Sequence, residues 1–473
     1  GKELRKREGE AFEAFNQFCI DQLSGDAPDV TEGDELNMDS PPQMQQLFYC
    51  KLGLPIRVRS KVQRGSKRDE LGFEGSPGTD DKAIDFALAQ DARGDDWRRE
   101  FLVTWKEIKA CHTRFKNYWR PYPLWIHPRD GFLHGGINNA ATTTHRFTGG
   151  DPNLLAIPSK DGGRVRSIVL PKKDDHVILS PDLNGEELRI TASLSKDPVM
   201  IEAYVGENRK DIHTLTASSI SGTVINREAP EMAESLSFTT IGGLPTLPYA
   251  EFSALLDSGE DSVRELTKNI RKLAKAVNFL LIYVGGASTL ARNIGVQVEV
   301  AEAFMQATMA TYPRLQPWQQ ESIEYARKHG YVLTSYGNRR HLGDGLFSTD
   351  NYTRTRLERQ AVNAQVQGCG SDIMKIICRT LMENKFHQTY GASGIVMPYD
   401  ELAFSVPRAA AWEAWLAMKD AMSITPPGHA VPQLPELKCS ALNWGTCVEL
   451  GAEPTEDQVN ELFDKQLAKR AAA

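Results

Sequence analysis

Two acidic segments that are far apart in the sequence each adjoin short apolar runs. Asp182 follows the run 177–179 (Val-Ile-Leu), which is typical of a buried strand, and precedes a helical pattern. Asp400 and Glu401 lie between two apolar runs in residues 394–406, which predicts a β-hairpin with acids at its tip. Two strands that each present a carboxylate can hold a pair of divalent ions about 3.5–4 Å apart, an arrangement suited to phosphoryl transfer. The alternative for Asp182 is a helix cap, because Asp is common at that position.

A predicted helix around residues 271–283 carries a second set of candidates. Arg271, Lys275, Phe279 and Tyr283 recur every four residues, so they line one face of this helix. Two cations followed by two aromatic residues could hold a nucleoside triphosphate, with the cations on the phosphates and a ring beside the base. A solvated basic stripe with ordinary core aromatics explains the same pattern, so both interpretations remain open.

Two further segments suit nucleic acid. A long helical pattern at 354–384 places Arg359, Asn363 and Gln367 on one polar side, where amides could bond to base edges or sugars. A basic loop at 56–68 suits phosphate backbones. For the helix, a plain exposed face is the commoner explanation, and for the loop, a solvated surface explains the pattern equally well.

Composition sets the general class. The chain has 473 residues, too many for one core, so two or three subdomains are expected. With 41% hydrophobic and 25% charged residues and a net charge of −7, it is typical of globular proteins and does not by itself indicate nucleic acid. Seven scattered cysteines without a CxxC motif favour reduced thiols and argue against a structural zinc site. No apolar run approaches the length of a membrane span, and no signal-like segment opens the chain.

The order of these segments resembles the polymerase region of DNA polymerase family A, the bacterial DNA polymerase I type. Residues 182–189 (DLNGEELR) resemble motif A, whose usual form is DYSQIELR. The repeat over 271–283 is similar to motif B, and residues 399–401 (YDE) are similar to motif C, normally HDE. Supporting segments are His145-Arg146, residues 151–158, residues 211–214 and residues 363–368.

The resemblance implies an α+β, right-hand polymerase architecture with an antiparallel-sheet palm and largely helical fingers and thumb. The expected domains are the thumb at 1–120, the first part of the palm at 121–200, the fingers at 201–362, and the second part of the palm with a C-terminal closing segment at 363–473. An insertion rich in Gly, Pro, Ser and acids is expected near 222–262, as a loop region. Because the chain begins inside a charged helical pattern, we expect a fragment of a longer protein. The resemblance implies that the family's proofreading domain would lie before Gly1, so no proofreading exonuclease domain is expected in this chain.

The resemblance also implies a role for each matching residue. Asp182 and Asp400 would hold two Mg²⁺ ions (with Mn²⁺ as a possible substitute), and Leu183 would contribute its carbonyl. Glu401 would be a nearby catalytic acid, and Lys275 would donate a proton to departing pyrophosphate.

Substrate contacts follow from the same resemblance. The implied dNTP-binding residues are Arg271, Lys275, Phe279, Tyr283, Glu187 and His213. Within this set, Glu187 and Tyr283 would crowd the ribose 2′ position and exclude ribonucleotides. The implied primer–template contacts are Arg146, Arg164, Asn363, Gln367 and Tyr399.

This sequence departs from the family pattern at several positions. Tyr399 stands where His is usual beside the primer terminus, although a phenol can still donate a hydrogen bond. Residues 183–185 (Leu-Asn-Gly) replace Tyr, Ser and Gln, and Val284 replaces the usual Gly. With these differences, the sequence resembles a divergent phage or organelle polymerase more than a bacterial housekeeping enzyme.

The predicted function is therefore template-directed DNA synthesis on primer–template DNA with dNTPs. The chain is expected to be a monomer that works with replication accessory proteins and without a membrane, in the cytoplasm, or in the host cytoplasm if phage-encoded. The alternatives are a single-subunit RNA polymerase and a catalytically inactive protein that binds primer–template. Glu187 and the segment 151–158 favour DNA synthesis, and the retained motif residues favour an active enzyme.

Overall fold

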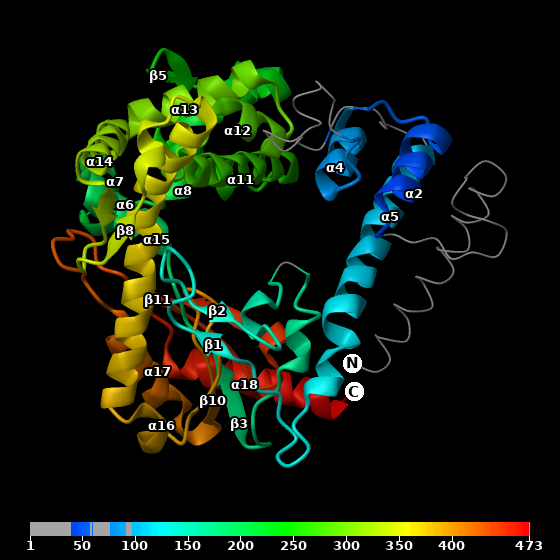
Figure 1. Ribbon diagram of the computed structural model, residues 1–473, viewed down its shortest axis with the longest axis vertical. Coiled ribbons are helices and arrows are strands. Elements are labelled where there is room, and N and C mark those ends of the chain that lie inside the picture. The colour runs from blue at the N-terminus through cyan, green and yellow to red at the C-terminus, as the bar shows by residue number, and fades with distance from the viewer. Residues whose placement is uncertain are drawn as a thin grey trace. The chain divides into compact units, whose positions relative to one another are not determined.

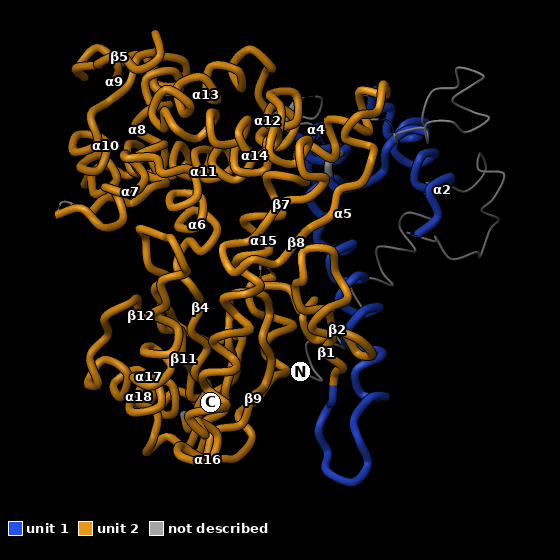
Figure 2. Tube along the Cα trace, turned by 60° about the vertical axis from the view of Figure 1, so that its left-hand side comes forward, with its two compact units in different colours: residues 1–134 blue, residues 135–473 orange. Residues whose placement is uncertain are grey.

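The computed structural model describes residues 39–56, 59, 76–90, 97–159, 161–207 and 209–472. The chain forms two compact units, residues 1–134 and residues 135–473, which Figure 2 shows in different colours. Most of the predicted basic loop at 56–68 lies outside the described residues. Within the described ranges, no helix combines the length and the apolar character that crossing a bilayer requires.

The described part of unit 1 is helical, as predicted. Its core gathers apolar side chains from several helices, and the rings of Phe48 and Trp105 meet edge to face with centroids 5.4 Å apart. The elements are α2 (Pro41–Gln45), the π-helix η1 (Gln46–Lys51), α4 (Asp81–Gln90), α5 (Trp97–Arg114), the π-helix η2 (Phe115–Trp119) and the 3₁₀-helix η3 (Tyr122–Trp125).

Unit 2 contains an antiparallel sheet in the order β12-β11-β3-β10-β9, and β4 pairs with β11 beside this path. All four residues of the central strand β3 are buried, which explains the continuous apolar run at 177–179. The strands β9 and β10 form the predicted hairpin around the acids. The sheet strands are β3 (His176–Leu179), β4 (Asp182–Leu183), β9 (Ser393–Val396), β10 (Ala403–Pro407), β11 (Pro435–Ser440) and β12 (Val448–Gly451).

Helices account for most of the rest of unit 2. The longest, α15, contacts α14 and β7 at one end and α16 and α17 near the sheet, so it connects the helical part with the sheet (Figure 1). The main helices are α6 (Glu186–Ser195), α7 (Pro198–Val205), α8 (Ile212–Glu228), α11 (Asp261–Ile282), α12 (Ala287–Ile294), α13 (Val298–Thr311), α14 (Leu315–His329), α15 (Asn351–Glu383), α16 (Phe386–Thr389), α17 (Ala411–Met422) and α18 (Glu456–Ala472). Short elements are β1 (Ile137–Asn138), β2 (Thr148–Gly149), η4 (Leu154–Ala156), η5 (Arg166–Ile168), β7 (Tyr331–Leu333), β8 (Arg339–His341), η6 (Asp344–Phe347), η7 (Arg408–Ala410) and η8 (Trp444–Thr446).

The prediction of a loop at 222–262 is wrong. The helix α8 continues to Glu228, and the region then forms α9 (Pro230–Ala233), the hairpin of β5 (Thr239–Ile241) and β6 (Leu244–Thr246), and α10 (Tyr249–Leu256). The reason is burial: Leu247 and Phe252 lie in the core of unit 2 and anchor a segment of polar composition. Gly222 serves this packing, since a Cβ there would lie 2.2 Å from the Pro245 carbonyl oxygen.

Candidate active site

The sheet brings the two acidic segments together. Asp182 forms an isolated bridge with Glu401, and the backbone N–H of Leu183 donates to the Asp400 carbonyl at 3.1 Å. Asp182 lies in the strand β4, whereas the residue at the N-cap of α6 is Gly185. The helix-cap interpretation of Asp182 is therefore wrong, and the predicted proximity of the acids is confirmed.

The electrostatics of this acidic cluster favour a bound cation. Burial, followed by the nearby charges of Asp182 and Glu401, raises the pKa of Asp400 to about 6. The Oδ1 atom of Asp182 is buried and accepts no hydrogen bond from the described part of the chain. A cation would satisfy this oxygen and relieve the repulsion between the acids.

Few side chains in the acidic cluster could act as metal ligands. Within the described ranges, no group of three or more His, Cys, Asp or Glu side chains is arranged to hold a metal ion. Mg²⁺, however, is usually bound through one or two carboxylates and takes its other ligands from waters and substrate phosphates. Asp182, Asp400 and the Leu183 carbonyl therefore fit such an ion.

Glu401 is held differently from the other two acids. Its Oε1 accepts hydrogen bonds from Ser180 Oγ at 2.5 Å and Trp444 Nε1 at 2.8 Å, and its Oε2 lies 3.1 Å from Arg166 Nη1. The Arg166 guanidinium stacks over the Trp444 ring at 3.8 Å. The Glu401 side chain is 9% exposed, so these neighbours fix it in the sheet. Its predicted catalytic role stays a prediction, and the contacts favour a positioning role.

Sequence reasoning missed three residues at this cluster. Arg166 and Trp444 hold Glu401, and Lys438 on β11 places its Nζ 2.5 Å from Asp182 Oδ2. Burial lowers the pKa of Lys438, but the hydrogen bond and the charge of Asp182 raise it above its usual value. No periodic signal marks these residues, because their contacts depend on strand register and long-range packing.

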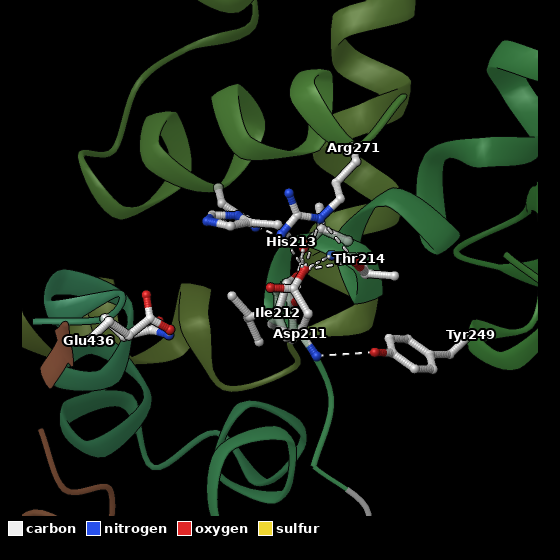
Figure 3. A network of polar contacts seen from close by, with 11 residues as sticks. Asp211, Ile212, His213, Thr214, Tyr249, Arg271 and Glu436 are labelled. Carbon is white, nitrogen blue, oxygen red and sulfur yellow. Dashed lines mark hydrogen bonds and ion pairs between the residues drawn. The ribbon is translucent and has the colours of Figure 1, made fainter. Parts of the chain in front are cut away.

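The first residue of the predicted triphosphate face, Arg271 on α11, meets the start of α8 at Asp211 and Thr214 (Figure 3). Arg271 donates from Nε to Asp211 Oδ1 and Thr214 Oγ1, each at 3.1 Å, and its Nη2 lies 3.0 Å from Asp211 Oδ1. The Asp211 carboxylate also accepts the Thr214 N–H at 2.7 Å as the N-cap of α8. The helix start thus fixes the orientation of Arg271.

His213 and the aromatic part of α11 continue this face. The centroid of the His213 ring lies 6.1 Å from the centroid of the Phe279 ring, and Lys275 Nζ lies 6.0 Å from the Phe279 centroid. Burial lowers the pKa of His213 to about 4; the charge of Asp211 opposes this shift, and the charges of Lys275 and Arg271 add to it. His213 is therefore neutral near pH 7 and can donate one hydrogen bond without adding charge.

A carboxylate connects the triphosphate face to the acidic cluster. Glu187 in the first turn of α6 accepts a hydrogen bond from the Tyr283 hydroxyl at the end of α11. Its other oxygen lies 2.6 Å from Arg146 Nη2. The Glu187 charge also contributes to the raised pKa of Asp400. The structure thus brings together predicted catalytic, nucleotide and DNA residues.

The remaining predicted DNA contacts are partly gathered here. Arg146 lies over the Tyr399 ring, 5.6 Å from its centroid, and Gln367 on α15 hydrogen-bonds to Tyr283. Asn363 lies one turn earlier on α15, and its buried Oδ1 has no partner among the described residues. Arg164 is exposed, and it is Arg166, two residues later, that reaches the acidic cluster.

Two residues that depart from the family pattern, Tyr399 and Val284, adopt a positive φ. Tyr399 is 51% exposed at the hairpin tip and has φ +60°. Val284 follows the end of α11 with φ +51°, a conformation that favours glycine and strains a β-branched residue. Val284 therefore keeps the backbone turn that glycine would serve, at a conformational cost.

Glu186 is a further acid that sequence reasoning did not single out. It is buried in α6, its Oε1 has no partner within the described ranges, and a Cβ on Gly370 would lie 2.8 Å from both carboxyl oxygens. Burial, followed by the charges of Asp400 and Glu187, raises the pKa of Glu186 from 4.5 to about 8. The folded protein therefore retains a proton that the unfolded chain loses, and stability falls as pH rises between these two values.

We expect Glu186→Gln to remove this dependence. In metal-free buffer, the free energy of unfolding should exceed that of the wild type by about 2–5 kcal/mol at pH 8.5 and differ little at pH 5, since each pKa unit corresponds to about 1.4 kcal/mol. Urea unfolding at the two pH values measures the difference, with the exposed Glu202→Gln as the control. An equal effect of Glu186→Gln at both pH values would show that the side chain is ionised in the fold.

An antiparallel sheet that gathers acids, with a basic and aromatic helix face near it, matches the polymerase architecture that the motifs predict. The chain belongs to DNA polymerase family A, whose family model matches residues 10–246 and 257–446. The match extends into the region predicted as an insertion and passes over only residues 247–256 there.

Individual relatives agree with this membership. The chain is 29% identical over 393 residues to a thermostable DNA polymerase I of Thermus thermophilus, covering 82% of this chain and 39% of that protein. It is 26% identical over 413 residues to a DNA polymerase I of Streptococcus pneumoniae, and this match covers 87% of this chain and 40% of that protein. The chain thus spans about two fifths of the length of these relatives.

A solved structure confirms the predicted α+β polymerase fold. The POL domain of Pol1 from M. smegmatis, in complex with DNA primer-template and dNTP, matches with a TM-score of 0.71 at 20% sequence identity. The match covers 94% of this chain and 66% of that chain.

Proposed function

We propose that this chain catalyses template-directed DNA synthesis, adding dNTPs to a primer 3′ end with release of pyrophosphate. The observation that carries the proposal is the meeting of Asp182 and Asp400 in the sheet, beside a helix face that carries Arg271 and Lys275. Membership of DNA polymerase family A and the DNA polymerase I relatives support the same activity. The M. smegmatis domain was solved with a primer-template and a dNTP, which are the substrates we propose here.

The residues present fit two Mg²⁺ ions held by Asp182, Asp400 and the Leu183 carbonyl. When bound, such ions stabilise charge on the attacking and leaving oxygens. Lys275 and Arg271 bind the triphosphate, and Lys275 gives a proton to pyrophosphate as it leaves. Arg271 is already oriented by Asp211, so little freedom is lost when phosphate is bound.

We assign the primer–template contacts to Arg146, Arg164, Asn363, Gln367 and Tyr399. Because Arg146 pairs with Glu187 and also lies over Tyr399, it can connect the primer terminus with the nucleotide sugar. The amide side chains on α15 can bond to base edges or sugars, and the arginines can meet phosphates. Base pairing then selects the sequence, while the protein binds the duplex backbone.

The domain assignment is also a proposal: thumb 1–120, palm 121–200 and 363–473, and fingers 201–362. The first compact unit ends at His134, inside the segment that we assign to the palm.

Sugar selection separates this function from the RNA polymerase alternative. Glu187 is held on both oxygens, by Tyr283 and Arg146, so its position beside the proposed sugar site is fixed. We expect the wild type to prefer dNTPs over rNTPs, and Glu187→Ala to raise relative rNTP use by about 10- to 200-fold, the range for a single steric contact.

Single-nucleotide incorporation with matched dNTP and rNTP measures this preference, with the exposed Glu265→Ala on α11 as the control. Efficient rNTP use by the wild type would identify an RNA polymerase. An unchanged ratio in Glu187→Ala would remove Glu187 from sugar selection.

A further inference from the structure

Lys438 lies on β11, the strand between β12 and β3 that also pairs with β4. In β11, Glu436 pairs with Asp182 of β4, and Lys438 pairs with Glu449 of β12. Because side chains alternate along a strand, Glu436 and Lys438 point to the same face of the sheet as their partners. The backbone of Lys438 is fixed as well, since its carbonyl accepts the Ser180 N–H at 2.7 Å.

The Lys438 side chain has two acceptors within reach. Its Nζ lies 2.5 Å from Asp182 Oδ2 and 3.8 Å from Glu449 Oε2. The first acceptor is the more enclosed, with the Asp182 side chain 23% exposed and the Glu449 side chain 59% exposed. The flexible lysine stem allows the ammonium group to change partner while the backbone stays in place.

We propose that Lys438 is a displaceable counter-ion of Asp182. It neutralises the Asp182 carboxylate in the absence of a divalent cation, and a cation that binds Asp182 displaces the ammonium group to Glu449. The inference rests on the proposed function, because that function makes Asp182 a metal ligand. Lys438 is thus a positioning residue: it holds Asp182 in the sheet and lowers the apparent affinity of the site for the metal.

If Lys438 competes with the cation for Asp182, substitutions at Lys438 and Glu449 should change the affinity for the cation in opposite directions, and their effects should be coupled. Removing the competing charge with Lys438→Gln should tighten cation binding by about tenfold, a usual size for coupling between two ligands. Removing the second acceptor with Glu449→Gln should weaken cation binding severalfold in the wild type. In the Lys438→Gln background, Glu449→Gln should have no effect, because Glu449 acts through Lys438.

Binding of Mn²⁺ to the protein without DNA or nucleotide tests these expectations. The loss of the free Mn²⁺ signal in electron paramagnetic resonance gives the affinity of each variant, and circular dichroism confirms its fold. Asp182→Asn identifies the binding that depends on this site. Lys419→Gln is the matched control, since Lys419 pairs with Glu453 on the surface and its loss changes the net charge equally. Lys438→Arg, which keeps the charge, should bind Mn²⁺ no more tightly than the wild type.

The outcomes separate the inference from the function on which it rests. Tighter binding in Lys438→Gln, unchanged binding in Lys419→Gln and a non-additive double variant support the counter-ion role. The counter-ion role is overturned, and the metal site stays intact, in either of two cases. In the first, Mn²⁺ binding depends on Asp182 but Lys438→Gln does not tighten it; in the second, the effects in the double variant are additive. No Asp182-dependent binding in the wild type overturns both.

Discussion

Asp182→Ala should reduce the rate of primer extension by at least about a thousandfold, because metal-mediated charge stabilisation contributes several kcal/mol and each 1.4 kcal/mol is a factor of ten. The same loss is expected for Asp400→Ala, since the two carboxylates adjoin through β4 and the hairpin tip. Binding of primer–template should persist in both variants, because neither carboxylate is a proposed DNA contact. Single-turnover extension and duplex titration measure the two properties separately.

The control for this experiment is Asp174→Ala, which removes an exposed acid just before β3. Its extension rate should stay close to that of the wild type. If Asp182→Ala or Asp400→Ala incorporated nucleotides normally, the assignment of these residues to the metal ions would be refuted.

The second large effect is expected at the triphosphate face. Lys275→Ala should lower the extension rate at saturating dNTP by about 10²–10³-fold, the usual loss when one preorganised donor to a developing charge is removed. Arg271→Ala should mainly weaken dNTP binding, because Arg271 is oriented by Asp211 and Thr214 before the nucleotide arrives. The dependence of the extension rate on dNTP concentration separates the two effects.

Lys272→Ala is the matched control, because Lys272 is an exposed cation on the same helix and lies outside the four-residue repeat. It should leave both the maximal rate and the dNTP dependence nearly unchanged. If Lys272→Ala lost as much activity as Lys275→Ala, general charge on α11 rather than a specific contact would explain the result.

Local patterns predicted much of the fold. The apolar run 177–179 became the buried strand β3, and the acids at 400–401 lie at the tip of the β9–β10 hairpin. The repeat over 271–283 lies on α11, with Tyr283 at its C-cap. These elements are predictable because burial and periodicity act over a few neighbouring residues.

Contacts between distant segments could not be predicted in this way. Lys438 reaches Asp182 only because of the register between β11 and β4, and nothing in its local sequence specifies that register. Arg166 and Trp444 meet at Glu401 from segments with no shared pattern. The region at 222–262 was predicted as a loop from its polar composition, yet a few buried side chains are enough to order it.

The role of Glu401 illustrates the same limit. The motif resemblance groups it with Asp400, but the side chains turn to different partners. Asp400 stays in the acidic cluster with a raised pKa, whereas Glu401 is bound by Ser180, Trp444 and Arg166. Adjacent residues in a hairpin tip can thus differ in function, because the chain turns between them.

The central claim is best tested by primer extension with the wild-type chain, a primer–template duplex, dNTPs and Mg²⁺. The account predicts that the primer grows one templated nucleotide at a time, and that growth stops when Mg²⁺ is chelated. Tight binding of the duplex with no extension in Mg²⁺ or Mn²⁺ would contradict it and would identify a protein that keeps the polymerase fold without its chemistry.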